Sequence, residues 1–234
     1  MDNIDFWHKT NILIHVSTGL IALMLGLMAL STIKGGKAHR QSGKLFLFFL
    51  TIVVVTGLFG VLIFKVNQFL LVITVLSGYN AYSGMRVLKN KTNTINRQDI
   101  CVAVLAASSG VYFLYYMKKI GMFWSPVIIY STLGALFLII TYDLLRYLIP
   151  QKKCGKLWLY EHIYKMVSAF TASLAAATGT IYADYHPHSQ YLPSLFGTLL
   201  AIGFIVYFYR KNNPKSKNKL IEKHKAIERR KKAV

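Results

Sequence analysis

Long apolar runs alternate with short polar segments along most of this chain. Each run has about 18 to 25 residues, the length that a helix needs to cross the ~30 Å hydrocarbon layer of a bilayer. Dividing the chain at clusters of charged and turn-forming residues predicts seven membrane-spanning helices: Asn11–Ile33, Leu45–Phe64, Gln68–Leu88, Ile100–Met117, Pro126–Ile149, His162–Tyr182 and Pro193–Tyr209. The pattern therefore predicts an all-α, polytopic transmembrane helix bundle over residues 1–211, followed by a tail over residues 212–234.

The positive charges give this bundle a direction. When the N-terminus is placed outside, 23 of the 28 Lys and Arg residues fall in the first, third and fifth loops and in the tail, which are then all cytoplasmic. Positively charged loops stay on the cytoplasmic side of a membrane, and the alternation holds at every loop only for an odd number of spans. We therefore expect an N-out, C-in orientation in the cell inner (plasma) membrane.

The composition agrees with a membrane protein. Hydrophobic residues make up 54% of the chain and charged residues only 15%, whereas about a quarter of the residues in soluble proteins are charged. The net charge of +20 would favour nucleic acid as the partner of a soluble chain. Here the positive charge is confined to loops and tail, so we expect the lipid bilayer as the partner and no nucleic acid.

The tail is strongly basic after Pro214 and predicts contact with lipid. A basic segment with a few apolar residues binds anionic cytoplasmic head groups, and each Lys or Arg near the surface contributes about 1 kcal/mol. A solvated, charged tail is the alternative. The lipid-binding candidates are Lys223, Arg229, Arg230, Lys231 and Lys232.

Two predicted spans hold polar residues at membrane depth. Ionisable side chains in a span are functional candidates, and Asp143 lies about two turns from the cytoplasmic end of the fifth span. Arg146, three residues later, shares its helix face, so we expect a local ion pair. Asn80 in the third span should bond to a neighbouring helix, because an unpaired amide in hydrocarbon costs several kcal/mol.

Small residues recur every three or four positions in the sixth and third spans. In "SAFTASLAAATGT" one row of them includes Thr171, Ala175 and Gly179, and in "SGYNAYSG" Gly78 and Gly84 follow the same rule. Side chains of this size let helices approach closely in lipid. We expect both spans to be packing helices, with a hydroxyl-lined polar pathway as the alternative.

The histidines separate by depth. His39 in the first cytoplasmic hairpin could meet Glu161 and His162 at the start of the sixth span, as ligands for a divalent metal or as a proton relay. Bonds from both histidines to loop carbonyls are the alternative. His15 lies near the outer face without a histidine partner at its depth, so we do not expect an embedded bis-histidine haem, although a tentative metal role for His15 stays open.

Three motifs resemble those of the DUF2306-type family of predicted bacterial membrane proteins. The segment "HVSTGLIALMLGLMAL" pairs a histidine, His15, with small residues at the head of a span, and "KGGKAHRQSGKLF" carries a His-Arg-x-x-Gly hairpin at His39. The segment "EHIYKMVSAFTASLAAAT" is similar to the family's later His-x-x-x-Met helix, here His162 and Met166. The resemblance covers the first ~50 residues and the sixth span, groups His15, His39 and His162, and implies no particular activity.

Three classes of function fit these observations. A non-enzymatic transport, channel-like or assembly-type membrane protein fits the tightly packed spans best. A membrane oxidoreductase or metal-dependent enzyme using His39 and His162 is the first alternative. A seven-span sensor or receptor is the second, because the number of spans and the orientation fit, although a fold alone does not define a function.

Overall fold

The chain folds into a helical bundle with no strand among the residues that the computed structural model describes, which are 2–64, 69–91, 94, 96–121, 125–150 and 154–212. Within these ranges there are seven α-helices and two short 3-10 helices: α1 (Asp2–Ser31), α2 (Lys37–Leu62), α3 (Phe69–Lys89), α4 (Arg97–Ile120), α5 (Pro126–Leu145), η1 (Arg146–Leu148), α7 (Leu157–Ile181), η2 (Ala183–Tyr185) and α8 (His188–Asn212). The all-α prediction is confirmed.

Five of these helices are long and apolar enough to cross a membrane: α1, α2, α4, α5 and α8. The described parts of α3 and α7 are not among them, because both carry polar residues that lower their hydropathy, such as Asn80 and Arg86 in α3 and Glu161 and Lys165 in α7. These two helices are also among the most enclosed. Their polar side chains therefore face protein more than the surroundings of the bundle.

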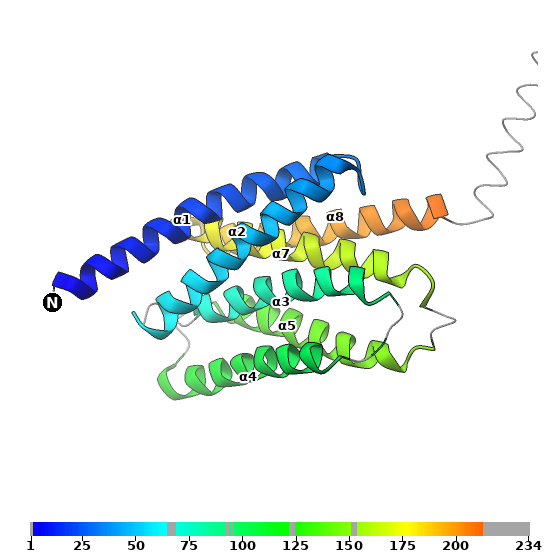
Figure 1. The fold of residues 1–234 in the computed structure, drawn as a ribbon. Coiled ribbons are helices and arrows are strands. Elements are labelled where there is room, and N and C mark those ends of the chain that lie inside the picture. Colours follow the sequence, from blue (N-terminus) through cyan, green and yellow to red (C-terminus); the bar gives the residue numbers. More distant parts are fainter. Residues whose placement is uncertain are drawn as a thin grey trace, which may run out of the picture.

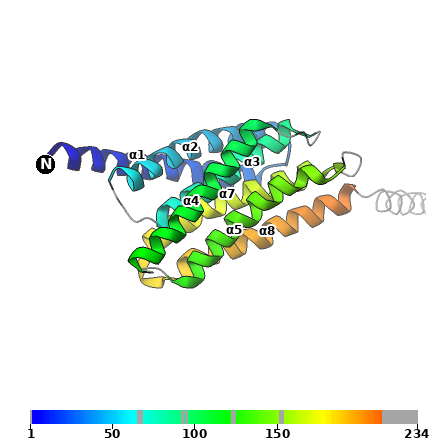
Figure 2. The ribbon, with the colours of Figure 1, turned by 90° about the horizontal axis from the view of Figure 1, so that it is seen from below.

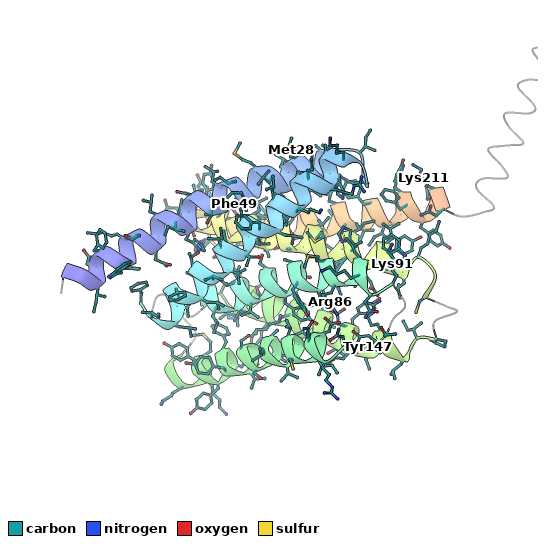
Figure 3. All side chains as sticks on the ribbon, viewed as in Figure 1. Met28, Phe49, Arg86, Lys91, Tyr147 and Lys211 are labelled. Atoms are coloured by element: carbon teal, nitrogen blue, oxygen red, sulfur yellow. The ribbon has the colours of Figure 1, made fainter. Side chains whose placement is uncertain are left out.

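The helices run in roughly the same direction, with α3 and α7 among the others (Figure 1 and Figure 2). α7 packs between α3 and α8 and also contacts α1, while α3 contacts α2, α4 and α5. The start of α1 and the end of α8 lie at opposite ends of the bundle (Figure 1). We call the end that holds the α1–α2 turn and the C-termini of α3 and α8 the basic end; Lys91 and Lys211 lie there (Figure 3).

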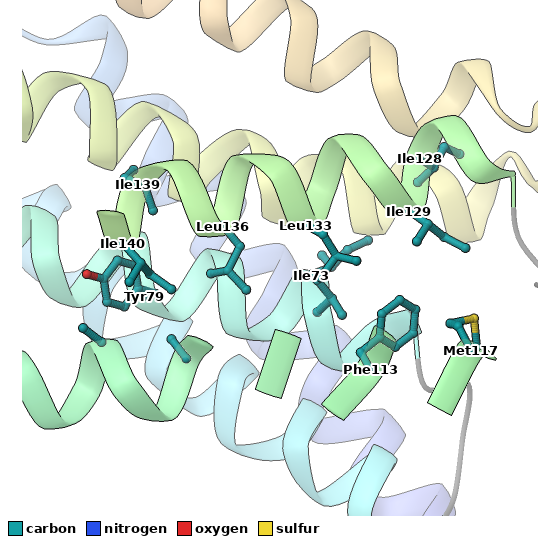
Figure 4. Close-up of a cluster of buried hydrophobic side chains, with 13 residues drawn as sticks. Ile73, Tyr79, Phe113, Met117, Ile128, Ile129, Leu133, Leu136, Ile139 and Ile140 are labelled. Atoms are coloured by element: carbon teal, nitrogen blue, oxygen red, sulfur yellow. The ribbon is translucent and has the colours of Figure 1, made fainter. Parts of the chain in front are cut away.

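Two apolar clusters hold the helices together. The larger joins α3, α4 and α5, where Phe113 and Leu136 are fully enclosed (Figure 4). The smaller joins α1, α2, α3 and α7 around Phe46 and Leu50. Many large apolar side chains elsewhere are exposed, as expected for helices whose outer surfaces face lipid.

Small residues bring α7 close to both neighbours, as their spacing predicts. A Cβ at Gly197 of α8 would lie 2.2 Å from Cγ2 of Thr171 in α7, and a Cβ at Gly84 of α3 would lie 2.9 Å from Cβ of Lys165. Near the other end of α7, a Cβ at Gly179 would lie 2.6 Å from Cγ of Gln190. At Gly84 and Gly197 a larger side chain would force the helices apart, whereas at Gly179 the flexible side chain of Gln190 would have to move.

The last helix begins earlier than the sequence predicts, at His188 instead of Pro193. A proline within the first turns of a helix leaves one carbonyl without its usual N–H donor, here the carbonyl of Ser189 four residues before it. The hydroxyl of Thr178 in α7 donates to this oxygen at 2.6 Å. The proline is therefore accommodated inside α8 because a neighbouring helix supplies the missing hydrogen bond.

Candidate functional site

An ion pair lies buried between α5 and α7. Nζ of Lys165 is 2.5 Å from Oδ1 of Asp143, and the Tyr79 hydroxyl of α3 donates to Oδ2 of the same carboxylate at 2.9 Å. Lys165 is only 2% exposed and Asp143 9%. Lys165 is eight residues into α7, or about 12 Å along the helix from its start at the basic end. The carboxylate thus has a cation and a hydroxyl as partners well inside the bundle.

A second buried ion pair lies beside the first, closer to the basic end. NH1 of Arg146, at the end of α5, is 2.8 Å from Oε2 of Glu161 in α7. The Tyr142 hydroxyl donates to Oε1 of Glu161 at 2.6 Å. Sequence reasoning paired Arg146 with Asp143 on its own helix; instead, each binds a different residue of α7.

A third pair joins α3 to the start of α4. Arg86 donates to both carboxylate oxygens of Asp99, from Nε at 2.7 Å and from NH2 at 3.0 Å, and Tyr82 donates to Oδ1 at 2.9 Å. Figure 3 shows Arg86 and Tyr147 near one another at this level of the bundle. Asp99 and Arg86 are partly exposed, so this pair lies between the buried pairs and the surface.

A cavity of about 30 Å³ connects parts of all three pairs, since Asp99, Asp143, Arg146 and Lys165 all line it. Such a volume holds a water molecule where polar partners are available. Ser83 also lines the cavity, and its buried hydroxyl has no hydrogen-bond partner among the described residues. The cavity is therefore a polar space between the carboxylates and the basic end.

The three pairs are balanced in charge, with three carboxylates facing three cations. Removing ions from water costs several kcal/mol each, which is recovered only when the partners and hydrogen bonds are in place. In a membrane, such residues mark ion paths, proton relays and substrate sites. We define Asp143, Lys165, Tyr79, Glu161, Arg146 and Tyr142 together as the buried ionic network.

His39 and His162 lie at the same level of the bundle. The rings of Phe46 and Phe170 are in contact, with centroids 6.4 Å apart. His39 precedes Phe46 by seven residues and His162 precedes Phe170 by eight, which is about 10 and 12 Å along two helices that run in the same direction.

Both imidazoles are anchored through Nδ1 to a backbone carbonyl. Nδ1 of His39 is 2.9 Å from the Ala29 oxygen, and Nδ1 of His162 is 2.8 Å from the Gly84 oxygen. A proton on each Nδ1 leaves Nε2 with a lone pair, the state in which histidine binds metals. The two carbonyls belong to helices, Ala29 to α1 and Gly84 to α3, and not to loops as the alternative expected. One nitrogen on each ring remains as a candidate ligand.

The other two candidate metal ligands are not part of this pair. Glu161 points towards Arg146 and Tyr142, because successive residues of a helix lie about 100° apart. Nδ1 of His15 lies 2.9 Å from the Thr56 hydroxyl, and His15 is 14 residues from Ala29, or about 21 Å along α1. No group of three or more His, Cys, Asp or Glu residues suited to a metal occurs among the described residues.

The hairpin lysine next to this site has a structural role beyond topology. Lys34 donates to the carbonyls of Ala29 and Leu30, which have no partner within α1, and its ammonium lies 4.6 Å from the Phe204 ring centroid. Burial lowers the pKa of Lys34. Gly35, at φ +79°, turns the chain towards α2.

Asn80 differs from its expected role. Its Nδ2 donates to the Leu76 carbonyl of its own helix at 2.9 Å and not to a neighbouring helix, and its Oδ1 is buried without a partner among the described residues. The nearby interhelical bond comes from Ser77, whose hydroxyl lies 2.9 Å from that of Ser173 in α7.

The lipid-binding candidates Lys223, Arg229, Arg230, Lys231 and Lys232 lie outside the described residues.

Sequence reasoning missed Lys165, Tyr79 and Tyr142. The signal in the sequence was that Lys165 is the one lysine or arginine within the sixth predicted span, while the fifth predicted span contains Asp143.

Comparison of the chain with protein-family models, with curated proteins and with solved structures finds no match.

Proposed function

We propose that this chain is an integral membrane transport protein and that the Asp143–Lys165 pair is its proton-exchanging site. The observation that carries the proposal is an ammonium and a carboxylate enclosed together inside the helical bundle, with Lys165 2% exposed. A carboxylate in this setting changes protonation when its cation moves away, because an unpaired buried charge is costly. The cavity that Asp99, Asp143 and Lys165 line would be the route of protons from the basic end.

The proposed topology is seven spans, N-out and C-in, in the plasma membrane. Five helices meet the length and apolarity of a span; α3 and α7 complete the set, since they lie among the other helices and their polar groups are enclosed by protein. Labelling of the two chain ends in intact and opened cells tests the topology. Both ends in the same compartment would contradict it. Membership of the DUF2306-type family remains a prediction.

Proton exchange is tested with the full chain in liposomes that enclose a pH-sensitive dye, under an imposed membrane potential. The wild-type protein should acidify or alkalinise the lumen faster than empty liposomes. Asp143→Asn, which cannot ionise, should remove this difference. Asp5→Asn is the matched control, because Asp5 forms an exposed ion pair with Lys9. This variant should keep the faster rate of the wild type. Equal rates for wild type and Asp143→Asn would overturn the proposal.

A second candidate function, a metal-dependent or redox protein, is favoured by the two anchored imidazoles. His39 and His162 supply two nitrogen ligands, so an exogenous ligand or a cofactor would have to complete the coordination. Elemental analysis and absorbance of the purified protein test it. Stoichiometric metal or a Soret band that disappears in His39→Ala and His162→Ala supports it, whereas a metal-free, transparent wild type contradicts it.

A further inference from the structure

A groove of about 640 Å³ runs between α5 and α7. Its α5 wall includes Ser131, Gly134, Leu138 and Tyr142, which recur at the spacing of one helix face. Its α7 wall is formed by residues that also lie on one helix face: Leu157, Tyr160, Glu161, Tyr164 and Lys165. The groove forms because α5 packs mainly on α3 and α4 while α7 packs on α3 and α8, so α5 and α7 are not closely packed on one another.

The groove opens on the surface that a membrane protein presents to lipid. Leu138 at its edge is 73% exposed, and Tyr142 and Tyr164 are 38% and 37% exposed. A Cβ added to Gly134 would have no atom within 4 Å, so the absence of a side chain there widens the groove. The volume is within the ~300–1,000 Å³ of ordinary ligand pockets.

Polarity changes along the groove. The part near Gly134, Ala135 and Leu138 is apolar, whereas the part nearer the basic end has the hydroxyls of Tyr160 and Tyr164 and the carboxylate of Glu161. The exposed Lys156 immediately precedes this end of α7. A ligand with a long apolar chain and a polar head matches this order. The Glu161 carboxylate is already paired with Arg146, so Lys156 is the charge that favours an anionic head.

The α5 wall of the groove has the length of one acyl chain. Ser131 and Tyr142 are 11 residues apart, or about 16 Å along α5. Half of the ~30 Å hydrocarbon layer is about 15 Å. We propose that the α5–α7 groove binds one acyl chain of an anionic phospholipid of the cytoplasmic leaflet, with the head group near Lys156. This binding does not depend on proton exchange at Asp143.

The bound chain would lie against the ionic network. Lys165 lines both the groove and the polar cavity. Glu161 and Tyr142 belong to the network and also line the groove. A lipid chain in the groove would exclude water from that side, and the cavity would remain the polar route to Asp143.

Photolabelling in nanodiscs tests the inference. The full-length protein is placed in phosphatidylcholine nanodiscs that contain phosphatidylglycerol with a diazirine on one acyl chain, and labelled peptides are located by mass spectrometry. We expect labelling concentrated on the α5 peptide around Gly134–Leu138. Gly134→Leu should reduce it severalfold. Gly203→Leu in α8, where a Cβ is also unobstructed, should leave it unchanged.

Two further measurements keep the outcome decisive. A diazirine-bearing phosphatidylcholine should label the same peptide less, and equal labelling by both lipids would overturn the preference for an anionic head. A photoreactive residue at Leu138 should attach to lipid; attachment to a second copy of the chain would show that the groove is an interface and overturn the proposal. Labelling spread evenly over all exposed helices would also overturn the proposal.

Discussion

The two halves of α7 are held in opposite ways. From Leu157 to Lys165, two charged residues form buried ion pairs with α5. From Ser168 to Ile181, small side chains and hydroxyls place the helix against α8 and α3, with close approaches at Gly197 and Gly179. Ionic contacts in a protein interior require complete partners, whereas close packing requires only the right shape. The first half is also close-packed where Lys165 meets Gly84, but it depends in addition on complete ionic partners, whereas the second half depends on shape.

The largest expected effect comes from breaking the ionic half. Lys165→Met leaves the Asp143 carboxylate buried beside Tyr79 without a cation, and it should destabilise the protein by about 3–5 kcal/mol. The double variant Asp143→Leu/Lys165→Met should recover most of this loss, because neither charge remains. Reversible unfolding in detergent micelles measures both.

The control for the ionic half is Lys9→Met. Lys9 pairs with Asp5 at 2.8 Å, but both side chains are mostly exposed, and such pairs contribute about 0–1 kcal/mol. If Lys165→Met were no more destabilising than Lys9→Met, the pair of Lys165 with Asp143 would not hold the helices together.

The close-packed half is tested at Gly197. Gly197→Ala adds a methyl group that would lie 2.2 Å from Cγ2 of Thr171, and overpacking of this kind costs about 1–3 kcal/mol. Gly203→Ala in the same helix meets no atom within 4 Å and should change stability little. Thermal unfolding of the two variants compares them directly. If the two variants were equally stable, α7 and α8 could move apart to accommodate the added methyl group without a loss of stability.

A smaller effect is expected where the ionic region approaches the surface. Arg86→Lys replaces two hydrogen bonds to Asp99 with a single ammonium contact, at a cost of about 1.5 kcal/mol. Arg97→Lys, at an exposed position on α4, is the control. Denaturant unfolding measures both changes, and identical midpoints would show that the forked contact contributes nothing.

The smallest effect concerns one hydroxyl in the close-packed half. Thr178→Val keeps the shape but removes the bond to the Ser189 carbonyl, which should cost about 1 kcal/mol. Thr180→Val removes only a bond within α7 at an exposed position and serves as control. Adding Pro193→Ala to Thr178→Val should restore stability, because the N–H of alanine can donate to the Ser189 carbonyl in place of the Thr178 hydroxyl. If stability is not restored, the Thr178 hydroxyl does not substitute for that N–H in the wild type.

The sequence predicts the outline of this molecule better than its chemistry. Apolar runs define helices because burial of a backbone in lipid requires internal hydrogen bonding, and all seven predicted segments overlap observed helices. Asp143 was recognisable as an unusual residue at depth. Its partner was not, since neighbour rules within one helix point to Arg146, and only the packing of α5 beside α3 and α7 brings Lys165 and Tyr79 to it.

The hairpin contacts and the ionic network also differ in when they can form during synthesis. Lys34 and His39 bond to carbonyls that lie only 4 to 10 residues earlier in the chain, so the first two helices can be completed as soon as they leave the ribosome. Asp143 enters the membrane 22 residues before Lys165. Until α7 arrives, the cation nearest to that carboxylate along the chain is Arg146, three residues later on the same helix face, since its own partner Glu161 also lies in α7. The arrival of α7 therefore supplies both final partners at once, Lys165 for Asp143 and Glu161 for Arg146.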